Sequence, residues 1–224
     1  MKQYSNIIAE RIEKISATLP QGVTLIAVSK YHPVEAVAAA YSAGQRHFGE
    51  SKAQDLVKKH EALPCDICWH FIGHLQSNKI KYIAPFIYMI HSVDSYQLLE
   101  EINKHAAKAG RTIPCLLQIH IAEEETKFGF TPEECLAMLK QEEWKKLENV
   151  KIRGLMCMAS NTDDNSRVAA EFRAVRALFD EIRDRWFADD KEFDTLSAGM
   201  SGDYLMAMEC GSTCVRIGSS IFEG

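Results

Sequence analysis

Lys30 is the residue of this sequence whose position best suits covalent chemistry. It follows an apolar run, residues 23–29, that is typical of a buried strand. An amine at the end of such a strand would be partly buried, and burial disfavours the charged ammonium form. A neutral amine is what Schiff-base formation with an aldehyde requires. Lys30 alone does not decide the chemistry, because a lysine at a strand end can also extend its ammonium into solvent.

Two glycine- and serine-rich segments near the C-terminus have the composition of anion-binding loops. Ser197-Ala-Gly-Met-Ser-Gly-Asp203 connects an expected strand to a helix that we expect to begin near Ser201. Gly211-Ser-Thr-Cys-Val-Arg-Ile-Gly-Ser-Ser220 contains a further strand and its exit loop. Glycines leave backbone N–H groups free to face an anion, and a helix N-terminus adds a favourable dipole. Either segment alone could be an ordinary turn, whereas two after neighbouring strands indicate a phosphate site.

Arg216 lies inside the last expected strand, between Val215 and Ile217. A charged side chain in the middle of a buried strand needs a partner. One interpretation is an ion pair with a carboxylate such as Glu50, and the other is a contact with the ring of a ligand. The residues alone leave both open.

Other chemistry-bearing residues do not form a recognisable site. Cys65 and Cys68 have CxxC spacing but lack the second ligand pair of a zinc site. His70 and His74 are four residues apart, but Gly73 and the expected strand prevent them from sharing one face of a helix. No HExxH motif is present. We therefore expect no metal site.

The composition narrows the class of protein further. The chain has 224 residues, of which 46% are hydrophobic and 25% charged, with a net charge of −5 and no basic stripe, so nucleic acid is not an expected partner. No apolar run approaches the ~20 residues that cross a bilayer, so no membrane association is expected. Seven cysteines without an export signal indicate free thiols and a cytoplasmic location.

These candidate residues must be positioned by a regular alternation of apolar runs and helical stretches. The expected strands are residues 23–29, 47–49, 69–73, 86–91, 114–121, 150–158, 193–197 and 214–217. An amphipathic helix over residues 1–19 precedes them. The pattern predicts an α/β fold, a (β/α)8 TIM-type barrel with an extra N-terminal helix, as one domain over residues 1–224. An open doubly wound sheet is the alternative, but eight strands at a spacing of ~25 residues favour closure.

Barrel topology brings the candidates together. Active sites of such barrels lie at the carboxyl ends of the strands, and phosphate is commonly held by the loops after strands seven and eight. Lys30 follows strand one, and the two glycine-rich segments follow strands seven and eight. The fold therefore predicts one site that combines an amine with an anion cradle.

Seven motifs in order carry a family resemblance. They are Ala27-Val-Ser-Lys30, His47-Phe-Gly-Glu50, residues 69–79, His91-Ser-Val-Asp-Ser95, residues 154–159, residues 196–203 and residues 211–218. Over residues 22–222 the sequence resembles the pyridoxal phosphate homeostasis protein family, also called the YggS or PROSC family. One departure is Ser51, where the family usually has an asparagine near the cofactor ring, so that contact is not expected here.

The resemblance implies a fold-type III barrel like the N-terminal domain of alanine racemase, with pyridoxal 5′-phosphate (PLP) as cofactor. It implies that Lys30 carries the cofactor as a Schiff base, that the phosphate is held in the loops after strands seven and eight, and that an arginine meets the pyridine nitrogen. The cofactor-binding residues expected on this basis are Lys30, Ser201, Gly202, Arg216, Gly218 and Ser219. No catalytic residue is expected.

Two functions remain open. The resemblance implies a monomeric carrier or buffer of PLP in vitamin B6 homeostasis, without appreciable turnover, whose partners are PLP and the apo-enzymes that receive it. The alternative is a small PLP-dependent amino-acid racemase or related enzyme. Racemisation needs acid/base groups on both faces of the substrate carbanion, and eight βα units leave no residues for a second domain. Tyr31 could serve, but we expect it to face away from Lys30, because adjacent strand residues point to opposite sides.

Overall fold

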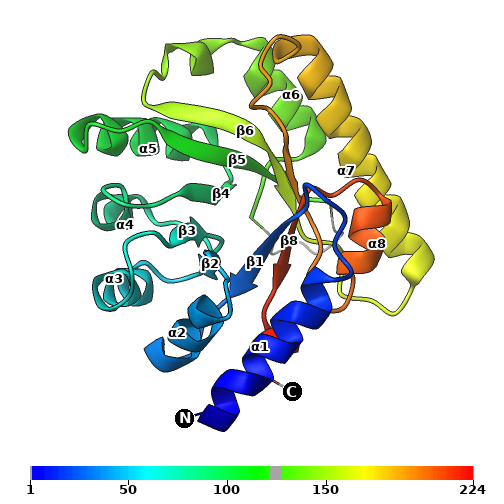
Figure 1. The fold of residues 1–224 in the computed structure, drawn as a ribbon. Coiled ribbons are helices and arrows are strands. Elements are labelled where there is room, and N and C mark those ends of the chain that lie inside the picture. The colour runs from blue at the N-terminus through cyan, green and yellow to red at the C-terminus, as the bar shows by residue number, and fades with distance from the viewer. Residues whose placement is uncertain (1, 122–127, 224) are drawn as a thin grey trace.

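The eight predicted strands close into a parallel barrel with the helices around its outside (Figure 1). The computed structural model describes residues 2–121 and 128–223. β1 pairs with both β2 and β8, and β7 pairs with β6 and β8, so the sheet closes on itself. The barrel prediction is confirmed, and the open sheet is excluded.

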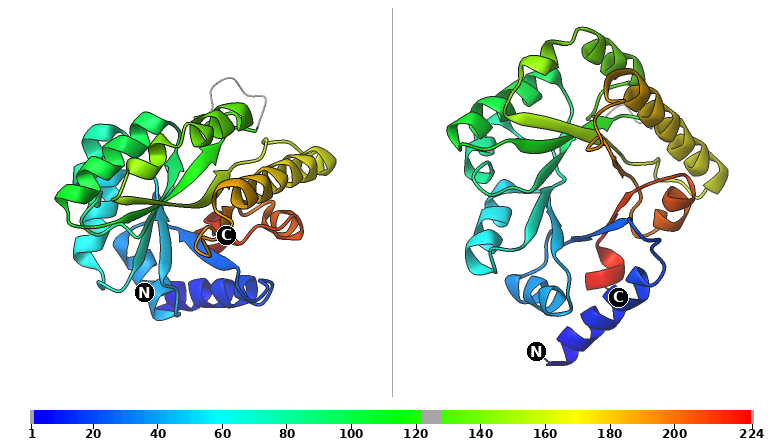
Figure 2. Two further views of the ribbon diagram at one scale, coloured as in Figure 1. Left: turned by 90° about the horizontal axis from the view of Figure 1, so that it is seen from above. Right: turned by 45° about the horizontal axis from the view of Figure 1, so that its top comes forward.

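Strands and helices alternate along the chain, and Figure 2 shows the helices arranged around the ring of strands. The strands are β1 (Thr24–Val28), β2 (His47–Glu50), β3 (Cys68–Phe71), β4 (Met89–Val93), β5 (Ile113–Ile119), β6 (Val150–Cys157), β7 (Thr195–Ser197) and β8 (Cys214–Ile217). The helices are α1 (Lys2–Ser16), α2 (Val34–Ser42), α3 (Ala53–Ala62), α4 (Ser77–Ile83), α5 (Tyr96–Lys108), α6 (Pro132–Lys140), the 3-10 turn η1 (Glu143–Lys146), α7 (Asn165–Trp186), α8 (Tyr204–Glu209) and α9 (Ser219–Phe222).

An apolar layer lies between the strands and the helices, and the barrel interior has one apolar region and one polar region. Residues that point outward from the strands pack under the helices as one apolar core, with Phe48 and Trp69 fully buried there. Inside the barrel, Met89, Leu116 and Met156 form a separate small apolar cluster on β4, β5 and β6. The rest of the interior contains buried polar side chains that link β2, β3 and β4 to β7 and β8.

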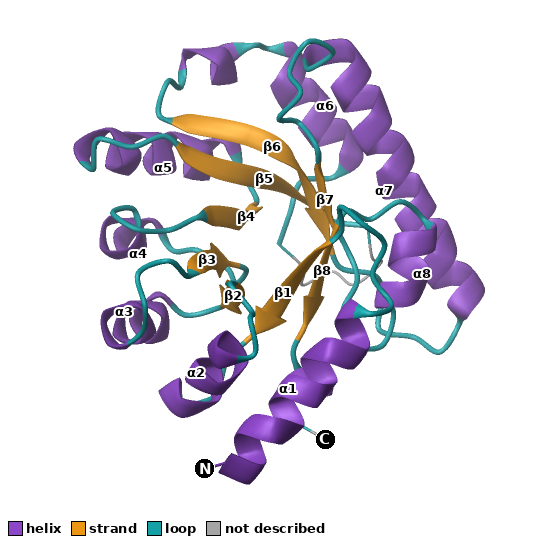
Figure 3. Cartoon of the chain, viewed as in Figure 1, coloured by secondary structure: helices purple, strands orange, loops and turns teal. Residues whose placement is uncertain are grey.

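The extra N-terminal helix packs beside α2, as Figure 3 shows, and it also contacts α9. Ile8, Ile12 and Ile15 are buried at the helical spacing that predicted this helix. Arg11 also donates hydrogen bonds to the carbonyls of Ile221 and Glu223. The predicted helix is confirmed, and it braces the C-terminal segment.

Some element boundaries were predicted wrongly. The fourth strand was expected over residues 86–91 but is Met89–Val93, because Phe86 stacks on His60 of α3 and belongs to the outer layer. His91 and Ser92 therefore lie inside a strand and not after it. The helix expected from Ser201 begins at Tyr204, and α9 was not predicted.

Within residues 2–121 and 128–223, no helix combines the length and apolar character needed to cross a bilayer.

Candidate functional site

A cavity of about 440 Å³ lies at the carboxyl ends of the strands, where the sequence placed the site. Its walls come from the exits of β1, β2, β3, β6, β7 and β8. All six predicted cofactor-binding residues line it together: Lys30, Ser201, Gly202, Arg216, Gly218 and Ser219. The cavity is referred to below as the mouth cavity.

Lys30 lies two residues beyond the end of β1 and is exposed, so the expectation of a partly buried amine is wrong. Tyr31 also lines the mouth cavity, and its ring centre is 5.7 Å from the Lys30 Nζ. The expectation that Tyr31 faces away was wrong as well. Strand geometry no longer applies at this position, because Tyr31 adopts a left-handed backbone conformation with φ of 69°.

A buried ion pair fixes the backbone just before Lys30. Lys59 of α3 donates to the Glu50 Oε1 at 2.5 Å and to the carbonyl of Ser29 at 2.8 Å. The Ser29 hydroxyl donates to the same carboxylate oxygen at 2.6 Å. The Glu50 and Lys59 side chains are only 1% and 7% exposed. Glu50 thus joins β1, β2 and α3 beneath the amine, and its cationic partner is Lys59 rather than Arg216.

The loops after β7 and β8 meet at Ser201. Its hydroxyl oxygen accepts hydrogen bonds from the backbone N–H groups of Gly218, at 3.3 Å, and Ser220, at 3.4 Å. A side chain added at Gly202 would meet no atom within 4 Å, so there is open space beside this loop. The Ser201 hydroxyl proton is left to be donated to an anion such as phosphate in this open space.

Arg216 is buried in β8 and reaches the floor of the mouth cavity. One guanidinium nitrogen donates to the Ser197 hydroxyl oxygen at 2.6 Å and another to the Cys157 carbonyl at 2.8 Å. Burial lowers the pKa of Arg216 from its ordinary value, but a guanidinium stays protonated at neutral pH. A buried donor of this kind favours an acceptor on a bound ligand, such as an unprotonated ring nitrogen.

The arrangement fits PLP. An amine at the rim, a hydroxyl with N–H groups on one wall and a guanidinium at the floor match its aldehyde, phosphate and pyridine nitrogen. Ser51, at the position where the family usually has asparagine, also lines the cavity.

Sequence reasoning missed the polar side chains beneath Arg216. His47, His70 and His91 were not assigned any role, and Ser197 was treated only as part of a loop. Successive side chains of a strand point to opposite faces, so the positions of the three histidines on β2, β3 and β4 could have indicated that all three point into the barrel. Lys127, a second lysine considered as an attachment point for PLP, lies outside the described residues.

Comparisons with known proteins agree with this geometry. The sequence model of the alanine racemase N-terminal domain family matches residues 5–224. A pyridoxal phosphate homeostasis protein from Helicobacter pylori is 37% identical over 99% of this chain and 98% of its own length. One from Schizosaccharomyces pombe is 38% identical over 90% of this chain and 84% of its own.

Solved structures are similar over the same extent. PipY of Synechococcus elongatus with PLP bound superposes with a TM-score of 0.87 at 37% identity, covering 96% of this chain and 99% of that one. An alanine racemase from Clostridium difficile superposes with a TM-score of 0.76 at 15% identity, which is a likeness of fold alone. This chain spans 56% of that racemase.

Proposed function

This chain belongs to the pyridoxal phosphate homeostasis protein family, and on that premise we propose that it binds PLP to hold and supply it in vitamin B6 homeostasis, without appreciable catalytic turnover. The observation that carries the proposal is the convergence of Lys30, Ser201 and Arg216 on the mouth cavity. PLP has an aldehyde, which links covalently to an amine. It also has a phosphate, which needs the contacts of an anion-binding site.

The predicted cofactor-binding residues have different roles in this proposal. Lys30 anchors the cofactor covalently, and its exposure leaves the linkage open to transfer. Ser201, with backbone groups at Gly202 and Gly218, holds the phosphate. Arg216 offers donors to the pyridine nitrogen, which keeps that nitrogen unprotonated and makes the ring a weak electron sink. The residues of this chain thus favour retention of the cofactor over carbanion chemistry.

The open rim of the cavity supports recipient apo-enzymes as partners. Lys30 and Tyr31 are both exposed there, so a second protein could approach the anchored cofactor directly. We propose that the chain acts as a monomer in the cytoplasm, where reducing conditions suit its seven free thiols.

We expect Ser201→Ala to weaken the binding of PLP about tenfold or more. A hydrogen bond to a charged group contributes roughly 1.5–3 kcal/mol, and about 1.4 kcal/mol is a factor of ten. Equilibrium titration followed by cofactor absorbance measures the change. Ser42→Ala, on the outer surface of α2, is the matched control and should leave the affinity unchanged. Pyridoxal without phosphate should bind weakly to the unsubstituted protein, and equal affinity for pyridoxal and PLP would remove the phosphate site.

The racemase alternative retains one specific observation in its favour, the presence of Tyr31 beside Lys30. Against it, Tyr31 is 74% exposed, so water is poorly excluded from any carbanion formed there. We expect the PLP-loaded protein to show no Lys30-dependent exchange of the α-proton of L-amino acids in deuterated water. Exchange at enzyme-like rates, on the order of 10 s⁻¹, that is lost in Tyr31→Phe would establish the enzyme instead.

A further inference from the structure

A continuous chain of polar side chains runs through the barrel beneath the proposed cofactor site. From the Ser197 hydroxyl, contacts lead to His91 Nδ1 at 3.0 Å, from His91 Nε2 to His70 Nδ1 at 2.8 Å, and from His70 Nε2 to His47 Nδ1 at 2.9 Å. Arg216 donates into the upper end at Ser197. At the lower end, His47 lines a cavity of about 270 Å³ at the amino ends of the strands, referred to below as the floor pocket.

The chain lies where barrels usually place apolar residues. Interiors of such barrels are filled mainly by branched apolar side chains, yet His70, His91 and Ser197 are 2%, 0% and 0% exposed. Burial of polar groups is costly unless each is hydrogen-bonded. Here the two buried histidines use both ring nitrogens. The contacts therefore form one connected network and not three independent pairs.

The network has a preferred direction. Burial holds the pKa of His70 and of His91 well below the ordinary value and also lowers the pKa of His47, so all three are neutral at neutral pH. A neutral histidine has one donor nitrogen and one acceptor nitrogen. In the preferred arrangement, Ser197 accepts from Arg216, which can only donate, and gives its own proton to His91 Nδ1. His91 and then His70 donate from Nε2, and His47 receives on Nδ1.

In one reversed arrangement, every contact of the network also has a donor and an acceptor. Each histidine then carries its proton on Nδ1, and Ser197 accepts from both Arg216 and His91. The Ser197 hydroxyl proton must turn to the Cys214 thiol, which lies within hydrogen-bond reach and is a weak acceptor. Burial raises the pKa of that thiol to about 11, so it stays protonated. The reversed arrangement is therefore less stable while His47 is neutral.

We propose that Ser197, His91, His70 and His47 form a polarised hydrogen-bond relay that positions the Arg216 guanidinium and couples it to the floor pocket. The relay is reversed when His47 becomes charged, because an imidazolium must donate from Nδ1. The four are positioning residues, and their role toward the cofactor rests on the proposed function.

The protons balance in this reversal. In the reversed state His47 carries a proton on both ring nitrogens, His70 and His91 each carry theirs on Nδ1 in place of Nε2, and Ser197 keeps its hydroxyl proton. The reversed state therefore holds one proton more than the original state, and solvent supplies it. Only His47 gains charge, while His70 and His91 exchange one neutral tautomer for the other.

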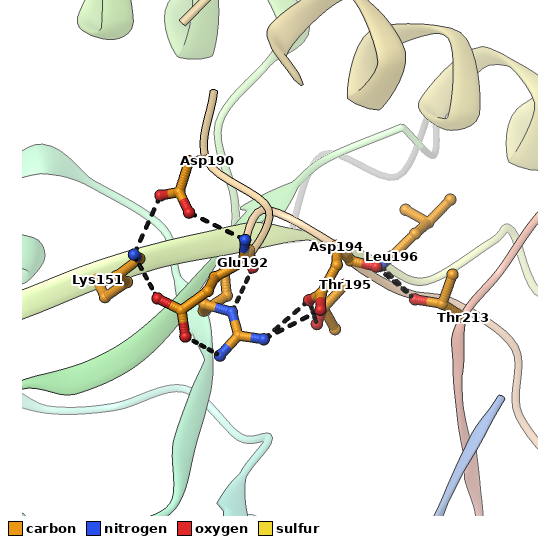
Figure 4. A network of polar contacts seen from close by, with 8 residues as sticks. Lys151, Asp190, Glu192, Asp194, Thr195, Leu196 and Thr213 are labelled. Carbon is orange, nitrogen blue, oxygen red and sulfur yellow. Dashed lines mark hydrogen bonds and ion pairs between the residues drawn. The ribbon is translucent and has the colours of Figure 1, made fainter. Parts of the chain in front are cut away.

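The surroundings of the floor pocket make His47 the group that responds. Arg153 is held by Asp194 at 3.0 Å and by Glu192. Figure 4 shows these two acidic residues in a network of polar contacts. The Tyr88 ring lies 5.5 Å from the His47 ring. Of the described residues that line this pocket, only His47 and the buried His70 are histidines, the side chain whose ordinary pKa lies near neutral pH. A proton or an anion in the floor pocket would therefore act on the relay at His47.

Nitrogen-15 NMR of protein labelled at histidine and arginine, without cofactor, tests the relay directly. At about pH 8, the preferred direction requires His47, His70 and His91 all to carry their proton on Nε2. As the pH falls, His47 should charge, and the other two should change tautomer at the same midpoint without charging. The buried guanidinium resonances of Arg216 should shift at that midpoint too.

His47→Asn supplies the decisive comparison, because its amide oxygen can still accept from His70 but cannot take up a proton. In this variant the tautomers of His70 and His91 should stay constant over the same pH range, and the Arg216 shift should be lost. His105→Asn, on α5, should leave all of these signals as they are in the unsubstituted protein. An Nδ1–H tautomer for His70 or His91 at about pH 8, or tautomer changes that persist in His47→Asn, would overturn the relay. Either outcome leaves the cofactor assignment untouched, because that assignment depends on labelling of Lys30.

Discussion

Replacing Lys30 with alanine should abolish covalent attachment of PLP and with it the visible absorption band of the linked cofactor. Lys30 lines the mouth cavity, with Ser201 and Arg216 on its other walls. Borohydride reduction of the loaded protein, followed by peptide mass mapping, should place the pyridoxyl group on Lys30. Noncovalent binding through the phosphate contacts should persist in the variant at reduced affinity, because those contacts do not involve the amine.

Lys52→Ala is the matched control for this experiment. Lys52 is also exposed, and its Nζ lies 5.5 Å from the Tyr31 ring, compared with 5.7 Å for Lys30. Its loss should leave both the absorption band and the labelled peptide unchanged. If the pyridoxyl group is found on Lys52 or Lys127 while Lys30 remains unmodified, the assignment of the anchor is wrong.

Lys59→Met should lower the free energy of unfolding by about 3–5 kcal/mol, because breaking a buried pair leaves an uncompensated charge. The charge left behind is the Glu50 carboxylate, whose side chain is 1% exposed. Chemical denaturation followed by circular dichroism measures the loss. Adding Glu50→Gln to Lys59→Met should recover part of it, since the buried charge is then removed.

A surface pair separates this effect from simple loss of a lysine. Lys104 pairs with Glu101 on α5 at 2.6 Å, but the Lys104 side chain is 60% exposed. Lys104→Met should therefore cost no more than about 1 kcal/mol. Equal losses in Lys59→Met and Lys104→Met would show that the Glu50–Lys59 pair does not stabilise the junction of β1, β2 and α3.

Much of the fold could be predicted because local patterns agree with it. The apolar runs at residues 23–29 and 214–217 are short, bounded by turns and evenly spaced, and they became β1 and β8. Barrel topology brought Lys30 and the two glycine-rich segments to one end, and the family resemblance supplied the six individual site residues. Tertiary packing decides which residues of an apolar run belong to a strand. Phe86 was wrongly assigned to a strand, because its ring stacks on His60.

The six predicted residues line one cavity, but the detailed geometry of that cavity was not predicted. The direction of Tyr31 depends on a left-handed backbone conformation that nothing in a tyrosine favours. The partner of Glu50 depends on how α3 docks, because Lys59 is nine residues away along the chain. The histidine contacts join strands that are 21 to 23 residues apart in sequence, a separation at which spacing carries no information on hydrogen bonding.

The divided interior of the barrel has a consequence for how this sequence can change over evolutionary time. On the side of Met89, Leu116 and Met156, exchanges that conserve volume usually cost less than about 1.5 kcal/mol each and can accumulate one at a time. On the side of His70 and His91, a single replacement leaves a buried neighbour without its partner, which costs roughly 1–3 kcal/mol. Such positions are epistatic: His70 can be lost without penalty only when its neighbours change with it. One half of the barrel interior can therefore drift freely, while the other half can change only in concerted steps.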